Sequence, residues 1–469
     1  MTGETRILIP DMAQRFAAVL GLGRSGLVAA QTLRASDARV WAWDDDEHAR
    51  GQAAAEGLRL VDLNYCDWSA PEFLLISPGI PHTHPAPHPV AARARAADKP
   101  IIGDIELLLR ARPEATYVGI TGTNGKSTTT ALIGHVLKEA GRRVETGGNI
   151  GASALGLAPL GADGCYVLEL SSYQLELTPS LDCRVAVLLN ITPDHLDRHG
   201  GMAGYIDAKA HIFAGTHERR AAVVGIDDAP SRALRDRLVA ERHPRVVPIS
   251  VEGAAPGGIH VADGMLIDDL DGRATSVVAL GAFARLPGRH NGQNVAAAYA
   301  TARLLGIDAA AIVAGIASFP GLAHRQEQVG EIDGIRFVND SKATNGEAAA
   351  KALASYDNIY WIAGGLPKEG GLAATERFWS RVRRAFLIGT AARDFATELD
   401  GRVPHEICGT LEAAVAAGYA AARQQGGPAT VLLSPACASF DQFANFEARG
   451  NAFRNEVAAL IEAPQAVRA

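Results

Sequence analysis

The sequence predicts an α/β protein of three domains, each built on a mostly parallel sheet with helices on its faces. One observation is a repeated pattern, in which a short apolar, β-branched run is followed by a glycine-rich turn and an alanine-rich helical stretch. A second is length, because 469 residues exceed one ordinary domain. The composition, 48% hydrophobic and 21% charged, is that of a globular protein rather than a disordered one.

The first predicted domain covers residues 1–104. Its expected elements are strands at 16–20, 39–43 and 73–77 and a helix at 25–35. The stretch PHTHPAPHP at 81–89 cannot hold regular structure and is expected to be a loop. Its three histidines suggest a metal site, but the flanking prolines and the lack of nearby acidic or thiol partners favour a solvated loop.

The second and third predicted domains cover residues 105–321 and 322–469. The second has expected strands at 117–120, 166–170, 185–190 and 221–225 and helices at 126–140, 291–305 and 309–318. Its Gly/Asp-rich segment 251–280 favours a small antiparallel sheet or hairpins. The third is predicted to be doubly wound, with strands at 335–338, 359–363, 385–388 and 430–433 and helices such as 347–355 and 411–424.

Charge and cysteine usage exclude several classes of function. The formal net charge is −7 without a basic tail or stripe, so neither nucleic acid nor a membrane is expected as a partner. The five cysteines are scattered without CxxC spacing, which argues against zinc and disulfide frameworks. No secretory signal and no apolar stretch of ~20 residues is present. These observations predict a cytoplasmic protein.

The first candidate site is the loop GLGRSG at residues 21–26, which lies between a predicted strand and helix. Asp44 ends the next strand, and together they match a dinucleotide-binding fingerprint. The glycines let backbone N–H groups approach an anion at a helix N-terminus. The alternative is a tight glycine turn that only packs helix on strand. The pattern favours a nucleotide, and taken alone it indicates NAD.

The second candidate is TGTNGKST at residues 121–128, also between strand and helix. Its backbone amides can cradle phosphates, Lys126 supplies a point charge, and the Ser127 hydroxyl can bind Mg²⁺. The spacing departs from the strict phosphate-loop pattern because Ile120 stands five residues before Gly125. ATP or GTP binding is predicted.

Three further side chains are expected at the same sheet edge. Glu169 ends one predicted strand, His195 follows the next, and Lys209 lies on the helix after it. Each of these residue types, found alone at such a position, usually has only a structural role. Their convergence behind a phosphate loop predicts an active site.

The sequence resembles the Mur ligase family through eight motifs in that family's order. These are TGTNGKST at 121–128, GGNIG at 147–151, ELSSYQLE at 169–176, NITPDHLDRH at 190–199, GRHNGQN at 288–294, HR at 324–325, NDSKATN at 339–345 and SPACASFDQF at 434–443. The last two resemble the D-glutamate-adding branch. The resemblance implies a Rossmann-like N-terminal domain, a central P-loop-type ATPase α/β domain and a C-terminal Rossmann-like α/β domain.

The resemblance also implies a reaction in peptidoglycan precursor synthesis. The carboxylate of UDP-N-acetylmuramoyl-L-alanine would attack the γ-phosphate of ATP, and the amine of D-glutamate would then attack the acyl phosphate. The UDP substrate, and not NAD, would bind the first domain. Closure of the third domain would complete the site. The protein is expected to be a monomer.

The site residues implied by the resemblance fall into five groups. The catalytic set is Lys126, Glu169, His195, Lys209 and Lys342. ATP would contact Gly122, Thr123, Asn124, Gly125, Lys126, Ser127, Thr128, Asn291, Asn294, Arg325 and Asp340. The UDP substrate would contact Arg24, Ser25, Asp44, Gly79, Asn149, Ser171 and His195, although an apolar residue is common in the family where Arg24 stands. D-glutamate would contact Thr344, Lys368, Ser439 and Phe446, and two Mg²⁺ would be held by Ser127, Glu169, His195 and Lys209.

Lys209 is implied to be a carbamate, because CO₂ added to its neutral amine makes an anionic oxygen ligand for Mg²⁺.

Other functions of the protein remain open on the sequence alone. A folylpolyglutamate synthase or an L-glutamate variant would share the fold. An NAD-dependent oxidoreductase would leave TGTNGKST and NDSKATN unexplained, and a non-catalytic nucleotide-binding regulator would not need Glu169, His195 and Lys209 together.

Overall fold

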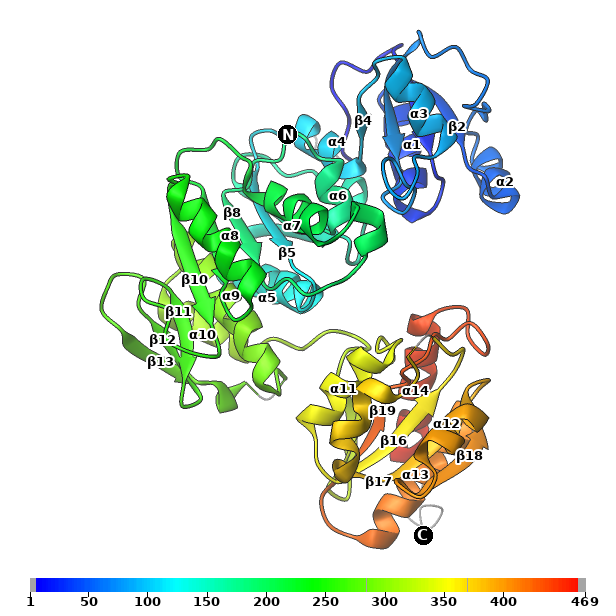
Figure 1. Cartoon of the computed structure of the whole chain (residues 1–469), viewed down its shortest axis with the longest axis vertical. Helices are drawn as coiled ribbons and strands as arrows, with labels where there is room; N and C mark the ends of the chain where they lie inside the picture. Colours follow the sequence, from blue (N-terminus) through cyan, green and yellow to red (C-terminus); the bar gives the residue numbers. More distant parts are fainter. Residues whose placement is uncertain (1–5, 284, 369, 463–469) are drawn as a thin grey trace. The chain divides into compact units, whose positions relative to one another are not determined.

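The computed structural model describes residues 6–283, 285–368 and 370–462, and it contains three sheets (Figure 1). Packing divides the chain into two compact units. The first is made of the chain up to Phe283 together with Arg289–Phe319, and the second of Ala284–Gly288 together with the chain from Pro320. Among the described residues, no helix is both long enough and apolar enough to cross a membrane.

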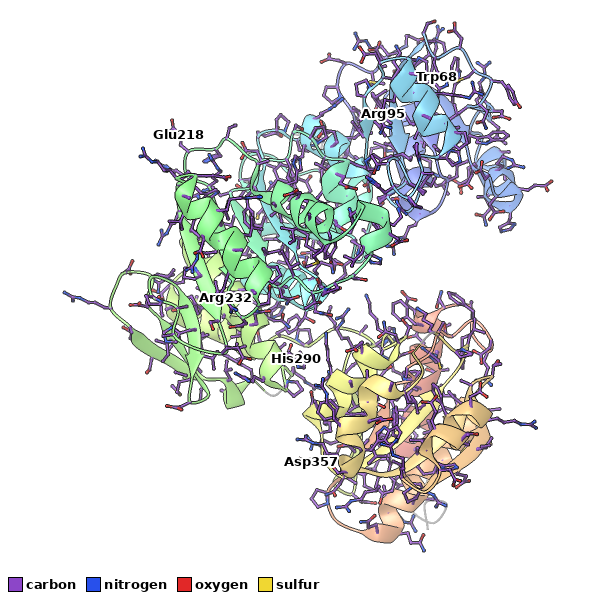
Figure 2. The ribbon with its side chains drawn as sticks, in the orientation of Figure 1. Trp68, Arg95, Glu218, Arg232, His290 and Asp357 are labelled. Carbon is purple, nitrogen blue, oxygen red and sulfur yellow. The ribbon has the colours of Figure 1, made fainter. Side chains whose placement is uncertain are left out.

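The first sheet has four parallel strands in the order β2–β1–β3–β4, with helices on both faces. Its elements are β1 (Phe16–Leu20), α1 (Arg24–Ala35), β2 (Arg39–Trp43), α2 (Glu47–Ala55), β3 (Pro71–Ile76), α3 (Pro89–Ala96) and β4 (Ile101–Ile102). Side chains of β1 alternate between two cores, with Val19 on one side and Leu20 on the other. Trp68 lies in the second core, where its indole N–H donates to the Leu63 carbonyl at 3.1 Å (Figure 2).

The second sheet has nine strands in the order β13–β12–β11–β10–β9–β8–β5–β7–β6. The strands are β5 (Thr116–Thr121), β6 (Arg143–Gly148), β7 (Gly164–Glu169), β8 (Val185–Leu188), β9 (Ala221–Gly225), β10 (Val246–Ser250), β11 (Ile259–Ala262), β12 (Met265–Asp268) and β13 (Thr275–Ala279). The helices are α4 (Asp104–Ala111), α5 (Lys126–Glu139), α6 (Ser172–Glu176), α7 (Met202–Ala210), α8 (Ala229–Ala240), α9 (Arg289–Leu304) and α10 (Ala309–Ala317). Strands β11 to β13 pair antiparallel, so the structure confirms the expected hairpin region.

The third sheet belongs to the second unit and has the order β14–β15–β19–β16–β17–β18. Its elements are β14 (Glu327–Ile332), β15 (Ile335–Asn339), α11 (Gly346–Ser355), β16 (Ile359–Gly364), β17 (Val382–Ile388), α12 (Ala392–Leu399), β18 (His405–Gly409), α13 (Leu411–Gln425), β19 (Ala429–Leu433) and α14 (Phe446–Glu462). Leu353 of α11 and Phe395 of α12 share one core, whereas Val415 of α13 and Phe453 of α14 share the other. Helices therefore cover both faces, as a doubly wound sheet requires.

The predicted α/β fold class is confirmed, and each predicted domain range encloses one sheet. The domain boundaries stay predictions. The sequence pattern did not identify β4, β6, β10, β14 and β18. Of these, β14 and β18 are edge strands with several exposed polar residues. In the central sheet β5 lies between β8 and β7, and all three strands run parallel. Their carboxyl ends therefore meet at one edge, which carries the phosphate loop, Glu169 and the segment after Leu188.

Candidate active site

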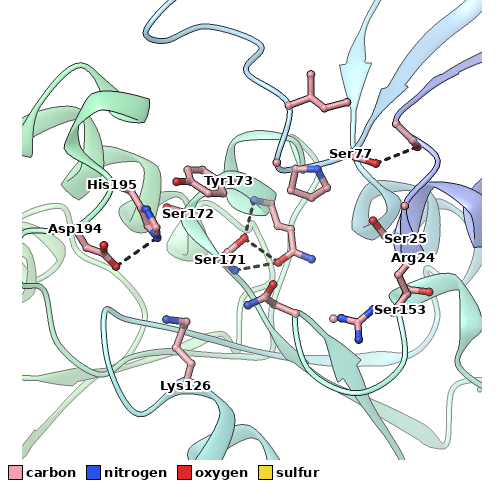
Figure 3. Close-up of a pocket in the computed structure, with 18 of the residues that line it drawn as sticks. Arg24, Ser25, Ser77, Lys126, Ser153, Ser171, Ser172, Tyr173, Asp194 and His195 are labelled. Carbon is pink, nitrogen blue, oxygen red and sulfur yellow. Dashed lines mark hydrogen bonds and ion pairs between the residues drawn. The ribbon is translucent and has the colours of Figure 1, made fainter. Parts of the chain in front are cut away.

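A cavity of about 580 Å³ lies in the first unit, between the loops of the first sheet and those of the second (Figure 3). Arg24, Ser25 and Asp44 from the loops of the first sheet line it. Lys126, His195 and Lys209 also line it, together with residues 171–174. Residues from both predicted nucleotide loops therefore share one cavity.

The first loop is closed by its own neighbours. Asp44 Oδ2 accepts a hydrogen bond from the Leu22 backbone N–H at 2.6 Å, and Ser77 Oγ donates to the Gly21 carbonyl at 3.1 Å. Helix α1 begins at Arg24 and has no side-chain cap on its first turn. Its N-terminal N–H groups therefore face the cavity without a capping side chain, which suits an anion.

The second loop is preformed. Gly122 has φ +146° and Gly125 has φ +87°, conformations that side chains rarely adopt. Lys126 Nζ donates to the carbonyl oxygens of Gly122 and Thr123, both at 2.9 Å. The Asn124 N–H donates to Asn190 Oδ1 at 2.9 Å. Helix α5 begins at Lys126 without a side-chain cap, so its N-terminus can also receive phosphate.

Helix α9, which carries the predicted ATP contacts Asn291 and Asn294, packs against this loop. Asn294 is buried, and its Oδ1 accepts a hydrogen bond from Thr129 Oγ1 at 3.1 Å. Its Nδ2 donates to Asn291 Oδ1 at 2.9 Å. A Cβ on Gly125 would lie 2.5 Å from Asn294 Oδ1, so the loop and helix are in close contact.

Lys209 lies on α7 with only 1% of its surface exposed. Its Nζ donates at 2.9 Å to the Gly122 carbonyl, the oxygen that also accepts from Lys126. The pKa of Lys209 is lowered from 10.5 to about 7, mainly by burial and also by repulsion from Lys126, while Asp194 acts in the opposite direction. Two amines thus converge on one carbonyl of the phosphate loop.

Glu169 and His195 differ in their surroundings. Glu169 is buried at the end of β7, where Oε1 accepts from Asn149 Nδ2 at 2.8 Å. Its Oε2 is buried and has no hydrogen-bond partner in the described part of the chain. The His195 side chain is half exposed, with Nε2 3.4 Å from Asp194 Oδ2.

The residues present fit a magnesium ion only if a ligand supplies part of its shell. Within residues 6–283, 285–368 and 370–462, no group of three or more His, Cys, Asp and Glu side chains could hold a metal ion. Mg²⁺ usually binds one or two carboxylates and takes its other ligands from water and substrate phosphates. The orphaned Glu169 Oε2 suits such a site.

The second unit carries the remaining predicted residues. Asp340 is buried, and burial raises the pKa of its carboxyl to about 7, although Ser434 Oγ donates to it at 2.8 Å. The Lys342 ammonium lies 5.3 Å from the centroid of the Phe446 ring. The Thr344 N–H donates to the Lys342 carbonyl at 2.8 Å. Ser439 is buried and Lys368 is exposed.

Sequence reasoning missed several residues of these sites. The Arg449 guanidinium is buried and donates to both the hydroxyl and the carbonyl oxygen of Ser341. It also donates to the carbonyl oxygens of Cys437 and Ala438. It joins the NDSKATN and SPACASFDQF segments, and no local pattern signals that role. Tyr205 lines the cavity and stands four residues before Lys209, which is one helical turn. That spacing places Tyr205 on the same helix face as Lys209, so the sequence could have indicated it as a site residue.

The expectation that the loop at 81–89 lacks acidic partners was wrong. His88 Nε2 lies 2.9 Å from Asp45 Oδ2, a residue 43 positions earlier in the sequence. Several of the loop's residues are half-buried. Sequence spacing does not indicate such a contact, because it depends on how the first sheet folds.

Comparison with known proteins gives matches over nearly the whole chain. Residues 120–302 match the family model described as Mur ligase middle domain. The chain is 54% identical to the UDP-N-acetylmuramoylalanine–D-glutamate ligase of Rhodospirillum rubrum, with 96% of each chain covered. It is 50% identical to the protein of that name from Caulobacter vibrioides, covering 97% of this chain and 98% of that one.

A solved structure supports the fold. The chain resembles the UDP-N-acetylmuramate–alanine ligase of Thermotoga maritima with a TM-score of 0.60. The likeness covers 95% of this chain and 99% of that one at 16% identity.

Proposed function

The chain belongs to the Mur ligase family as an ATP-dependent ligase that adds D-glutamate in peptidoglycan precursor synthesis, and we propose that it does so on UDP-N-acetylmuramoyl-L-alanine through an acyl phosphate. The observation that carries the mechanism is the convergence of Lys126 and Lys209 on the Gly122 carbonyl of a preformed phosphate loop.

In the first step the substrate carboxylate attacks the γ-phosphorus of ATP, a P–O bond forms, and ADP leaves. Two anions must approach one another, so neutralising charge is the main requirement. Lys126 is placed in the loop to supply it, and the N-terminus of α5 adds partial positive charge. In the second step the amine of D-glutamate attacks the acyl carbon, loses a proton to solvent, and phosphate leaves.

Ser127, Glu169, His195 and Lys209 would hold Mg²⁺, two ions in our proposal. When bound, magnesium would neutralise charge on the phosphate oxygens. The buried, unpartnered Glu169 Oε2 supports this assignment.

Carbamylation of Lys209 is part of the proposal. A pKa of about 7 leaves much of the amine neutral near neutral pH, which is the form that adds CO₂. The product is an anionic oxygen ligand in place of a buried cation. We expect Lys209→Ala to lose activity and to regain part of it with small carboxylates such as formate.

The remaining assignments are proposals from motif position. Arg24, Ser25, Asp44, Gly79, Asn149, Ser171 and His195 would bind the UDP substrate, and all seven line the cavity. Gly122–Thr128, Asn291, Asn294, Arg325 and Asp340 would bind ATP, with Lys342 assisting phosphoryl transfer. Thr344, Lys368, Ser439 and Phe446 would bind D-glutamate.

A phosphate-release assay tests the proposal. Wild-type protein should release phosphate only when ATP, Mg²⁺, UDP-N-acetylmuramoyl-L-alanine and D-glutamate are all present. Equal rates with L-glutamate would contradict the stereochemical assignment, and no release would contradict the reaction. Quenching of NADH fluorescence would favour the oxidoreductase alternative.

Three properties stay predictions. A cytoplasmic location suits the five free cysteines, because thiols stay reduced there. A monomer would be tested by sedimentation. Ligand-induced closure would be tested by small-angle scattering, and equal dimensions with and without substrates would contradict it.

A further inference from the structure

Tyr173 is an aromatic residue of the cavity to which the mechanism assigns no role. It is the second residue of α6, and its side chain lies beside His195 in the site (Figure 3). The two rings have centroids 5.2 Å apart. Tyr173 therefore lies close to the reacting end of the cavity.

Two further side chains contact the Tyr173 ring. The Arg198 guanidinium lies 4.7 Å from the ring centroid. The His199 ring is stacked on Tyr173 at 5.4 Å with an interplanar angle of 20°. Both contacts are made by the ring and not by the hydroxyl.

The residues that contact the ring are themselves held. His199 has a buried side chain, with Nε2 2.9 Å from Ser172 Oγ and Nδ1 3.1 Å from Glu176 Oε1. Arg198 donates to the Gly79 carbonyl at 2.7 Å, and Gly79 lies in the loop assigned to the UDP end. The phenol is thus fixed before any substrate binds, which lowers the entropic cost of using it.

The Tyr173 hydroxyl has no hydrogen-bond partner in the described part of the chain. Other tyrosines of this unit do have partners: the Tyr205 hydroxyl lies 3.1 Å from Thr123 Oγ1, and Tyr166 donates to the Ala158 carbonyl at 2.9 Å. Burial raises the pKa of the Tyr173 phenol, so it remains a donor at neutral pH.

We propose that the Tyr173 hydroxyl donates a hydrogen bond to an oxygen of the UDP-linked substrate in the portion between the pyrophosphate and the reacting carboxylate. The inference rests on the proposed function and names a specificity residue for it. Arg198 connects Tyr173 to the UDP end, and the neighbouring His195 lies at the reacting end. An acyl or ether oxygen of the sugar, lactyl or alanyl group is the acceptor that such a donor selects.

Titration calorimetry with two ligands tests this placement. Tyr173→Phe keeps the stack and removes the hydroxyl, so affinity for UDP-N-acetylmuramoyl-L-alanine should fall about five- to tenfold. Affinity for UDP, which ends at the pyrophosphate, should stay unchanged, and kcat should change less than KM. Tyr65→Phe is the matched control, because Tyr65 is 86% exposed and lies outside the cavity lining; it should alter neither affinity.

Two outcomes would overturn the inference. Equal affinities of Tyr173→Phe and wild type for the full substrate would show that the hydroxyl makes no hydrogen bond to it. Equal losses for UDP and for the full substrate would place the hydroxyl elsewhere or give it a purely structural role. Because binding is measured without turnover, a wild-type protein that binds the full substrate and fails to ligate it would contradict the proposed function alone.

Discussion

The two glycine-rich loops at residues 21–26 and 121–128 share a local architecture but have opposite electrostatic neighbours. Each follows a parallel strand, precedes a helix whose first turn has no side-chain cap, and lines the same cavity. Asp44 from the neighbouring strand closes the first loop by accepting from Leu22. Lys126 and Lys209 both donate to a carbonyl of the second. The charged side chains that contact each loop therefore set what that loop can do.

This difference explains why the GLGRSG motif at residues 21–26, taken alone, indicated NAD. A carboxylate beside a glycine loop suits hydroxyl or N–H groups of a nucleoside, whatever chemistry occurs elsewhere. Two lysines beside a similar loop suit a triphosphate whose charge shifts during transfer. Four predictions test whether these neighbours have the roles that the comparison gives them.

The largest effect is expected at Lys126. Lys126→Met removes a positive charge at the phosphate loop, so kcat should fall about 100- to 1,000-fold. Lys138→Met, an exposed lysine on the same helix, is the control and should leave kcat unchanged. Steady-state phosphate release measures both. A Lys126→Met enzyme with near-normal kcat would refute the role given to the second loop.

The next effect concerns the packing of the first loop. Gly26→Ala would place a Cβ 1.8 Å from the Gly21 backbone oxygen, whereas a Cβ on Gly23 meets nothing within 4 Å. We expect Gly26→Ala to lower the free energy of unfolding of the first unit by about 3 kcal/mol. Gly23→Ala should change it by less than about 0.5 kcal/mol. Urea denaturation compares the two variants, and equal free energies of unfolding would show that a Cβ on residue 26 fits beside the Gly21 carbonyl.

Much of this fold could be predicted from the sequence because its strands are buried on both faces. Strands β5, β7 and β8 read as largely apolar runs, and the loop after β5 carries Gly122 and Gly125 at positions with positive φ. The shared edge of Thr121, Glu169 and His195 followed from parallel pairing alone. Parallel pairing thus allows residues that follow separate strands in the sequence to be predicted at one edge of the sheet.

The rest depends on contacts between distant residues. Arg449 reaches Ser341 across 108 positions, and the Arg198 contact with Gly79 spans 119. Neither has a local signature, because a buried arginine and a surface arginine look alike in sequence. Edge strand β14 was missed for a related reason: its half-exposed residues give little apolar pattern.

A smaller effect is expected at Asp44. Asp44→Ala removes the acceptor for the Leu22 N–H and the carboxylate assigned to the UDP substrate, so KM for that substrate should rise about 30-fold. Asp44→Asn retains a carbonyl acceptor and should raise KM less. KM for ATP should stay constant in both, because the second loop is untouched. An equal rise in both KM values would mean that the two loops are not separate sites.

The smallest effect is a pH dependence of stability at Lys209. Its pKa is about 7 in the folded protein against 10.5 when unfolded, so between these values the unfolded state binds more protons and wild-type stability rises with pH. Lys209→Met has no such group. Its stability advantage over wild type should therefore grow by about 1 kcal/mol as pH falls from 8 to 7, and level off below about pH 6. Denaturation in CO₂-free buffer measures the difference between two proteins that share all their other titrating groups, including Lys126 and Asp194 beside residue 209. A gap that stays constant from pH 9 to 7 would mean that Lys209 remains charged in the fold, and the second loop would then hold two permanent cations.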